Sequence, residues 1–400
     1  MAVKSEIGCG GRRLTLVDRL YHWCVGLMPV LYLYNVPVLN ISVGTVLLLV
    51  LLPVPLFYIY KGLERGKHTV KGLPFFLFYL YLMVRCAGSA VNMVLCMAAF
   101  LHIWGFTFGS LRIEKIRSVL EWFALVNLAL ILLQYAAYYG LRRPIVYIPR
   151  QLLHEQFRDS WAFKPVSGLY RPTSLFLEPA HYAQYGCFSL ISVLFPLDGK
   201  KPDLKRAALI SLGIVLTTSG MGIMLTSGIL VWYIAFNKRK KGSFIIKILK
   251  WVPAVAVGFL LLMAFPFFRT ALTRVFGKVN GYNAIVGRTH NWSNSVGMMK
   301  GKDLLLGYGY DAKFNYYLAG LPDTIYKFGV AAVILEFCCF AYPMLKKCSN
   351  YVWCCSVVFM ILFVFAHLTS FYIQVFYMGI IIADAVVPGK QLLKVKFLWF

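Results

Sequence analysis

Runs of about 20 apolar residues recur along the whole chain, and they constrain its fold more than any other feature. Each run is long enough to cross a hydrocarbon core of roughly 30 Å as a helix. A helix also satisfies its own backbone hydrogen bonds, as a lipid environment requires. We therefore predict an all-α, polytopic membrane protein with about 12 transmembrane helices, in which residues 1–400 form a single integral membrane domain.

The predicted spans cover most of the chain. They are roughly 19–36, 39–60, 73–88, 89–108, 119–139, 180–197, 206–219, 221–236, 249–268, 325–344, 351–369 and 371–387. The seventh and eighth spans are short, and only Ser219-Gly220 separates them. They form either a tight hairpin or one broken helix.

The composition agrees with this interpretation. The chain is 60% hydrophobic and 14% charged, with a mean hydropathy of +0.70, whereas soluble domains are about 45–50% apolar and about 25% charged. A net charge of +26 would indicate nucleic acid in a soluble protein. Here the basic residues cluster between apolar runs, as the positive-inside rule describes, so we expect a lipid bilayer and no nucleic acid as partner.

Basic residues also predict the orientation. With the N-terminus inside, every inner connection is basic, and the short outer connections near 37, 220 and 370 carry no charge. Both termini are then cytoplasmic. The 10 cysteines lie in or beside apolar segments or in inner connections, so we expect no structural disulfide.

Two long outer loops, about 140–180 and about 268–324, interrupt the short connections. Each carries more basic than acidic residues: six against three in the first and seven against three in the second. Long loops in compact proteins are commonly functional. In the first loop, Leu153, Phe157 and Trp161 recur every four residues, which predicts a short helix in the headgroup plane, acting as a membrane anchor or contributing to a site.

The loops combine arginine with aromatic residues. Aromatic rings pack against sugars, and guanidinium groups bind phosphate oxygens bidentately. Tyr308 and Tyr310 flank glycines in Gly307-Tyr-Gly-Tyr310, where they either stack on a saccharide or pack within the loop. The loops thus suit a saccharide phosphate.

Three segments together resemble a known family. Residues 171–185 (RPTSLFLEPAHYAQY) resemble the RP-S-FxEPxxxAxY segment of O-antigen and capsular polysaccharide polymerases of the Wzy type. Leu216-Thr-Thr-Ser219-Gly220 resembles the T-x-S-x-G turn of these proteins. Gly287-Arg288-Thr-His-Asn-Trp292, Gly307-Tyr-Gly309 and Asn315-Tyr-Tyr-Leu318 follow the order of motifs in their large outer loop. The resemblance covers about 171–340 by motif.

The resemblance implies a glycosyltransferase of the O-antigen polymerase–ligase superfamily. Such an enzyme joins polyprenyl-pyrophosphate-linked oligosaccharide repeat units into O-antigen or capsular polysaccharide on the outer face of a bacterial cytoplasmic membrane. A protein that regulates chain length is the further partner it implies. Ligases of the superfamily place His before the Asn of the last motif, where this chain has Phe314. That difference favours a polymerase.

Arginines are the expected phosphate ligands. The chain contains no Asp-x-Asp pair, so we expect neither a metal nor another cofactor to bridge the pyrophosphate. Arg288 and Arg171 are the first candidates for stabilising the charge that develops there. The structural alternatives are a loop ion pair with Asp311 for Arg288 and a snorkelling position at a helix end for Arg171.

Glu178 begins a span, where a carboxylate is costly unless it has a partner. It is either the general base or a structural partner of Arg171. His181 lies one helical turn further and either shares the proton or only forms a hydrogen bond, and His290 is an alternative base. The remaining substrate-binding candidates are Arg85, Arg269, Arg274, Trp292, Tyr308, Tyr310 and Asn315.

Three other functions remain open, the last of them a non-catalytic assembly or scaffold protein. The first is a ligase that transfers the glycan to a different acceptor. The second is a polysaccharide flippase or other transporter. Transporters typically show related halves, broken helices and charges at the bilayer midplane, whereas this chain concentrates its charge in the two outer loops.

Overall fold

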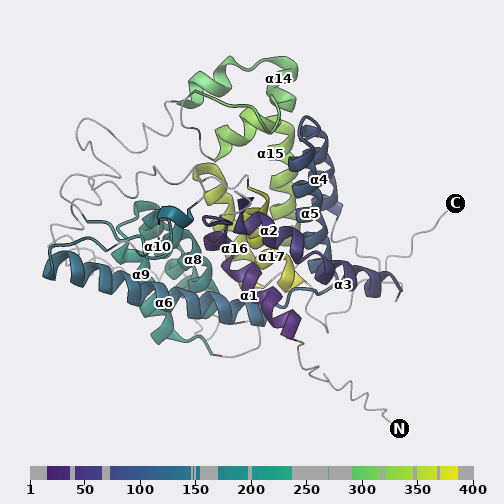
Figure 1. Cartoon of the computed structure of the whole chain (residues 1–400). Coiled ribbons are helices and arrows are strands. Elements are labelled where there is room, and N and C mark those ends of the chain that lie inside the picture. Colours follow the sequence, from purple (N-terminus) through teal and green to yellow (C-terminus); the bar gives the residue numbers. More distant parts are fainter. Residues whose placement is uncertain are drawn as a thin grey trace, which may run out of the picture.

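The computed structural model is almost entirely helical (Figure 1). It describes residues 16–36, 41–64, 73–145, 147, 150–153, 170–196, 201–236, 269, 291–315, 318, 320–345, 349–366 and 370–385. The helices are α1 (Leu16–Leu31), α2 (Val43–Val50), α3 (Pro53–Glu64), α4 (Leu73–Arg85), α5 (Ala90–Thr107), α6 (Ile113–Gly140), α8 (Pro179–Leu194), α9 (Leu204–Leu216), α10 (Gly220–Phe236), α14 (Gly301–Leu306), α15 (Leu321–Leu345), α16 (Asn350–Phe365) and α17 (Phe371–Ala385). Short 3-10 turns are η2 (Arg150–Leu152) and η4 (Val296–Met298).

One small antiparallel sheet accompanies the helices. Strand β1 (Asn35–Val36) pairs with β2 (Ile41–Ser42), so that Asn35 lies opposite Ser42. The pair lies between α1 and α2 and carries no core of its own. The prediction of an all-α fold is therefore confirmed.

Four described helical segments are long and apolar enough to cross a membrane. They are Val43–Glu64, Ala90–Thr107, Ile113–Gly140 and Leu321–Ala341. Shorter apolar helices follow four further predicted spans: Leu73–Arg85, Gly220–Ile234, Asn350–Phe365 and Phe371–Ile382. The protein is thus an α-helical membrane protein. The predicted span 249–268 lies outside the described residues, and the total of about 12 spans stays a prediction.

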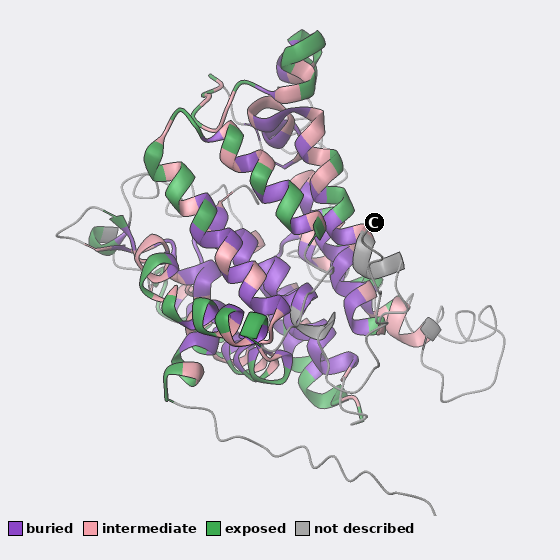
Figure 2. Ribbon diagram, turned by 90° about the vertical axis from the view of Figure 1, so that its right-hand side faces the viewer, coloured by how far each residue is buried: buried purple, intermediate pink, exposed green. Residues whose placement is uncertain are grey.

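Buried and exposed side chains agree with a lipid surround. Large aromatic residues fill the middle of the bundle, where Figure 2 shows the buried residues gathered. The outward faces of α3, α4 and α5 nevertheless expose large apolar side chains, among them Phe57, Leu77 and Val94. Soluble monomers rarely expose contiguous apolar patches of this kind, whereas lipid covers them without cost.

Several helices begin at a polar cap. The side chains of Ser42, Ser89, Asp203 and Ser349 each accept a hydrogen bond from the backbone N–H three residues on. These caps satisfy N–H groups that have no partner within the helix. The caps fix the starts of α2, α5, α9 and α16. Each start lies within a few residues of the start of the corresponding predicted span.

The chain reverses between α9 and α10. Ile214 lies against Gly222, where an added Cβ would be 3.0 Å from the Ile214 Cγ2 atom. In one continuous helix these residues would be about 12 Å apart. Thr218 turns the chain with a φ of 56°. The predicted pair of short spans is therefore a hairpin and not a single broken helix.

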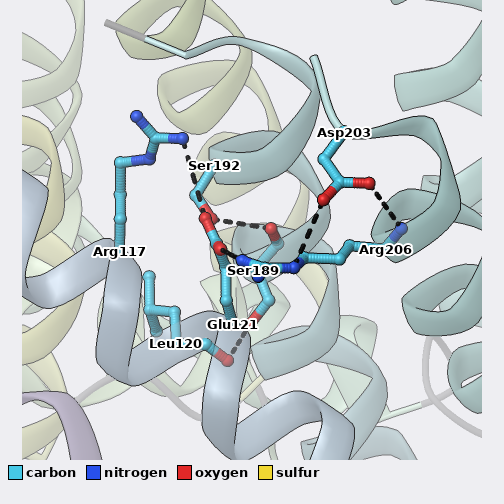
Figure 3. Close-up of polar contacts among 7 residues, drawn as sticks. All are labelled: Arg117, Leu120, Glu121, Ser189, Ser192, Asp203 and Arg206. Atoms are coloured by element: carbon cyan, nitrogen blue, oxygen red, sulfur yellow. Dashed lines mark hydrogen bonds and ion pairs between the residues drawn. The ribbon is translucent and has the colours of Figure 1, made fainter. Parts of the chain in front are cut away.

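Ion pairs hold one end of the bundle. Glu121 of α6 lies 3.6 Å from Arg117 and 3.0 Å from Arg206 of α9, and Arg206 also lies 3.3 Å from Asp203 (Figure 3). Nearby, the Ser189 hydroxyl of α8 donates to the Leu120 carbonyl at 3.0 Å. We call the end formed by residues 18–22, 58–62, 108–121 and 203–206 the ion-pair end.

The opposite end gathers a different set of connections. Its described residues are 32–36, 41–42, 85–92, 135–145, 147, 150–153, 170–178, 216–220, 307–315, 318, 320, 364–366 and 370–372, and we call it the tyrosine end. Arg117 and Tyr135 of α6 belong to opposite ends. Tyr135 follows Arg117 by 18 positions, which correspond to about 27 Å of helix, close to the thickness of a hydrocarbon core of roughly 30 Å.

Candidate functional site

Two buried amides of α6 hold the segment that carries Arg171. The Asn127 Oδ1 atom accepts from the Ser174 hydroxyl at 2.7 Å and from the Leu175 N–H at 3.4 Å. The Gln134 Oε1 atom accepts from the Ser174 N–H at 2.9 Å. Ser174 has a φ of 53°, a backbone angle that residues other than glycine rarely adopt. The two amides therefore fix a strained turn three residues after Arg171.

Glu178 is the N-cap residue of α8, and its side chain makes no capping hydrogen bond. Its carboxylate is exposed. Tyr32, just after α1, is buried, and Tyr372, Tyr377 and the negative charge of Glu178 are close enough to interact with its hydroxyl electrostatically. Glu178 therefore lies at the surface near Tyr32. His181 lies one turn further along α8 and is half-buried.

Tyrosines surround the start of this segment. The ring of Tyr170 stacks on Tyr138 at 4.2 Å and meets Tyr135 edge-on at 5.8 Å. Burial, followed by the neighbouring Tyr147 and Tyr138, raises the pKa of Tyr170 to about 12. Arg171 is close enough to Tyr135 to interact with it electrostatically. The arginine thus sits beside a cluster of aromatic rings.

The α9–α10 turn belongs to the same end. The Tyr135 hydroxyl donates to the Leu216 carbonyl at 2.6 Å. Thr217, Thr218 and Ser219 are all buried, and the Ser219 hydroxyl accepts from the Gly222 N–H at 3.3 Å. Two of the segments singled out in the sequence, 171–185 and 216–220, therefore meet on α6.

The Gly307–Tyr310 turn packs on a kink in α15. Gly329 interrupts α15 with φ 74° and ψ 176°, and Gly307 has a φ of 71°. A Cβ on Gly307 would lie 2.5 Å from the Gly329 nitrogen, and one on Gly329 would overlap the Leu305 carbonyl. Only glycine permits both the backbone angles and this approach.

The kink exposes carbonyls that the turn and α4 then satisfy. The Tyr308 N–H donates to the Tyr326 carbonyl at 2.9 Å, and the Gly309 N–H donates to the Lys327 carbonyl at 2.8 Å. The Tyr81 hydroxyl lies 2.6 Å from the Phe328 carbonyl and 3.3 Å from that of Leu306. Buried carbonyls of a broken helix need such partners.

Arg85 is part of this arrangement. Its Nη2 atom donates to the Gly307 carbonyl at 2.6 Å, and its own carbonyl accepts from the Tyr310 N–H at 3.4 Å. Arg85 therefore joins the end of α4 to the turn by a charge-assisted hydrogen bond. These contacts of Arg85 hold the turn in place, which is a structural role and not contact with a ligand.

The first residues of α17 connect the two clusters. Phe371 stacks on Tyr310 at 5.2 Å, and Tyr372 stacks on Tyr32 at 5.1 Å. Burial raises the pKa of Tyr310, with smaller contributions from Tyr372, Cys86, Asp311 and Asp323. The ring of Tyr310 is thus packed in the protein, and two consecutive residues of α17 contact the turn and Tyr32.

The other predicted site residues fall into two groups. Arg288, His290 and Arg274 lie outside the described residues. Arg269 and Asn315 are exposed, and Trp292 is half-buried in a short helical segment. Among the described residues, no group of three or more His, Cys, Asp or Glu side chains is arranged to hold a metal ion.

Sequence reasoning missed the supporting residues. Asn127 and Gln134 stand seven residues apart within an apolar span, a spacing that places both amides on one face of a helix. Polar residues inside a span usually have a function or a partner, so this signal was available. Tyr81 and Tyr32 gave no comparable signal, because tyrosine is common near membrane surfaces.

Comparison with known protein families finds one similarity. The family described as O-antigen ligase matches residues 207–331. This region contains the α9–α10 turn, the Gly307–Tyr310 turn and the kinked start of α15. No curated protein and no solved structure matches the chain.

Proposed function

We propose that this protein is a membrane glycosyltransferase that polymerises polyprenyl-pyrophosphate-linked oligosaccharide repeat units without a metal. One observation carries the proposal. Two elements of the region similar to O-antigen ligases, the α9–α10 turn and the Gly307–Tyr310 turn, lie at the same end as Arg171 and Glu178. The family similarity supports glycan transfer on a lipid carrier in a bacterial membrane.

The proposed reaction breaks the bond between the first sugar of the donor and its pyrophosphate. Arg171, together with Arg288, binds the phosphate oxygens and stabilises the negative charge that develops on them. The N-terminus of α8, which begins at Pro179, also favours an anion. Glu178 removes the proton of the attacking hydroxyl of the acceptor sugar, with His181 or His290 as the alternative base.

The tyrosine end faces outward in this proposal, and the ion-pair end faces the cytoplasm. The ion-pair end carries the basic residues Arg112, Lys115, Arg117, Lys205 and Arg206, as cytoplasmic connections usually do. Both chain termini are then cytoplasmic. A regulator of chain length is the protein partner that a polymerase needs.

The orientation can be measured with single cysteines. Exposed Lys313 at the tyrosine end and exposed Lys201 beside the ion-pair end are each changed to cysteine in a protein whose native cysteines have been replaced. A membrane-impermeant maleimide added to intact cells should label Lys313→Cys and not Lys201→Cys. Labelling in the reverse pattern would remove the basis for an outward-facing site.

A ligase is the second candidate, because the matching family is described as O-antigen ligase. A ligase would transfer a finished glycan to a different acceptor and leave its length unchanged. A polymerase would lengthen the lipid-linked glycan itself. Phe314, at the position where ligases resembling this chain carry histidine, favours the polymerase.

The test uses the native host with this gene deleted. Complementation with the wild-type gene should restore a ladder of lipid-linked glycans, which is resolved by electrophoresis of extracted material. Arg171→Ala should abolish the ladder at normal protein abundance, whereas Arg143→Ala, which removes an exposed arginine of the same loop, should not. A deletion strain that still makes the full ladder would refute the polymerase, and full-length lipid-linked glycan that is never transferred would indicate a ligase.

A further inference from the structure

Three aromatic rings form an array at the tyrosine end, beside the Gly307–Tyr310 turn. Tyr326 lies between the other two, with its centroid 5.0 Å from Tyr308 and 5.2 Å from Phe314, at interplanar angles of 59° and 63°. The Tyr308 side chain is 46% exposed, whereas Tyr310 two residues later is packed against Phe371. A large ring thus stays in contact with solvent at this position.

The array is held in place by the backbone. The Tyr308 N–H donates to the Tyr326 carbonyl, and the Tyr326 hydroxyl donates to the Lys313 carbonyl at 3.4 Å. The first of these bonds exists because the kink at Gly329 frees carbonyls in α15. Binding to rings that are already ordered loses little conformational entropy.

Polar groups surround the rings. Asn92 donates to the exposed Asp311 carboxylate at 2.8 Å, and Lys313 and Asn315 are exposed. Lys327 is paired with Asp323 at 3.0 Å, so its charge is already compensated. An aromatic face with a few amide and carboxylate groups is suited to a polar ligand with one apolar face.

We propose that Tyr308, Tyr326 and Phe314 form a platform that binds a sugar ring of the glycan, apart from the pyrophosphate. The inference rests on the proposed function. A pyranose packs the C–H groups of one face on an aromatic ring and directs its hydroxyls to surrounding amides and carboxylates. The platform lies within residues 207–331, the region similar to O-antigen ligases. Two residues after Tyr308, Tyr310 packs against Phe371 of α17.

The test measures saccharide binding directly. The probe is the oligosaccharide released by mild acid from lipid-linked repeat units of the host that lacks this gene. Saturation-transfer NMR on the full-length protein in detergent gives its dissociation constant. Tyr308→Ala should weaken binding about tenfold, the size expected for losing one aromatic contact, and Tyr308→Phe should keep it.

Tyr60→Ala is the matched control, because Tyr60 of α3 is 66% exposed and lies away from this end. It should bind like the wild type. Equal binding by Tyr308→Ala and the wild type would overturn the platform, as would a uniform loss in Tyr308→Ala and Tyr60→Ala.

The outcome can be separated from that of the proposed function. If binding depends on Tyr308 but deletion of the gene leaves the glycan ladder intact, the platform stands and the polymerase does not. If the ladder depends on the gene but Tyr308→Ala changes neither binding nor chain length, the polymerase stands and the platform is refuted.

Discussion

The tyrosine end and the ion-pair end are held together by different forces. At the tyrosine end, the loops are fixed mainly by buried amides, tyrosine hydroxyls and close backbone contacts, such as Asn127 with Ser174 and Gly307 with Gly329. At the ion-pair end, Glu121 joins Arg117 and Arg206, and the Arg206 side chain is 54% exposed. Exposed ion pairs are weak and screened by salt, whereas buried neutral contacts are not.

The difference bears on how an anionic substrate can be bound. Charges that pair with each other within the protein are not available to a ligand. At the tyrosine end even Arg85 donates to a carbonyl and not to a carboxylate, and Glu178 makes no capping bond. The contacts described at the proposed catalytic end are therefore largely between neutral groups, unlike those of the ion-pair end.

The largest effect should come from Gly329→Ala. The residue would have to hold φ 74° and ψ 176°, and its Cβ would overlap the Leu305 carbonyl. Backbone strain and overpacking together should cost at least about 3 kcal/mol. We expect loss of folded protein, measured by fluorescence-detected size exclusion and by the thermal midpoint in detergent.

Gly228→Ala is the control for this substitution, since a Cβ at that position of α10 would meet no atom within 4 Å. It should raise stability by up to about 1 kcal/mol through helix propensity. A Gly329→Ala protein as stable as the wild type would mean that the kink is not a fixed feature of α15.

The kink also marks the limit of what sequence predicts. The apolar runs predicted α5, α6 and α15 closely, because helix length and hydropathy follow directly from the bilayer. The sequence singled out Gly307–Tyr310 as part of an outer loop, but it did not reveal the partner of this segment, Gly329, which lies in an apolar run. Nothing local distinguishes a glycine that packs against a distant turn from one that merely lies in a span.

The same limit applies to the candidate site. The motifs identified Arg171 and Glu178, and Arg85 was predicted to bind substrate. The hydrogen-bond partner of Arg85, the Gly307 carbonyl, is 222 residues away along the chain. Hydrogen bonds of this separation depend on the tertiary arrangement, and residue types alone do not reveal them.

A smaller but still large effect is expected for Asn127→Ala. It leaves the buried Ser174 hydroxyl and the Leu175 N–H without their acceptor, at a cost of about 2–3 kcal/mol. The thermal midpoint should fall, and the glycan ladder should shorten because Arg171 loses its support. Asn127→Asp keeps the acceptor oxygen and should retain more of both. Equal loss in the two variants would argue against the acceptor role.

Tyr81→Phe should have an intermediate effect. The substitution removes one hydroxyl that serves the Phe328 and Leu306 carbonyls and should cost about 1–2 kcal/mol. Tyr60→Phe, at an exposed position, should leave the thermal midpoint unchanged. If Tyr81→Phe behaved like this control, water or another donor would already satisfy the kink, and α4 would not be needed to hold it.

The smallest effect should come from the ion-pair end. Glu121→Gln removes the carboxylate that joins Arg117 and Arg206. The pair with Arg206, whose side chain is 54% exposed, should contribute about 0–1 kcal/mol, and the glutamine oxygen can still accept from Arg117. The difference from the wild type should shrink further between low salt and about 1 M salt, where charges are screened within about 3 Å. Thermal midpoints of both proteins across this range provide the measurement. A loss as large as that of Asn127→Ala, unchanged by salt, would mean that the two ends are stabilised alike, because the cluster would then behave as a buried network.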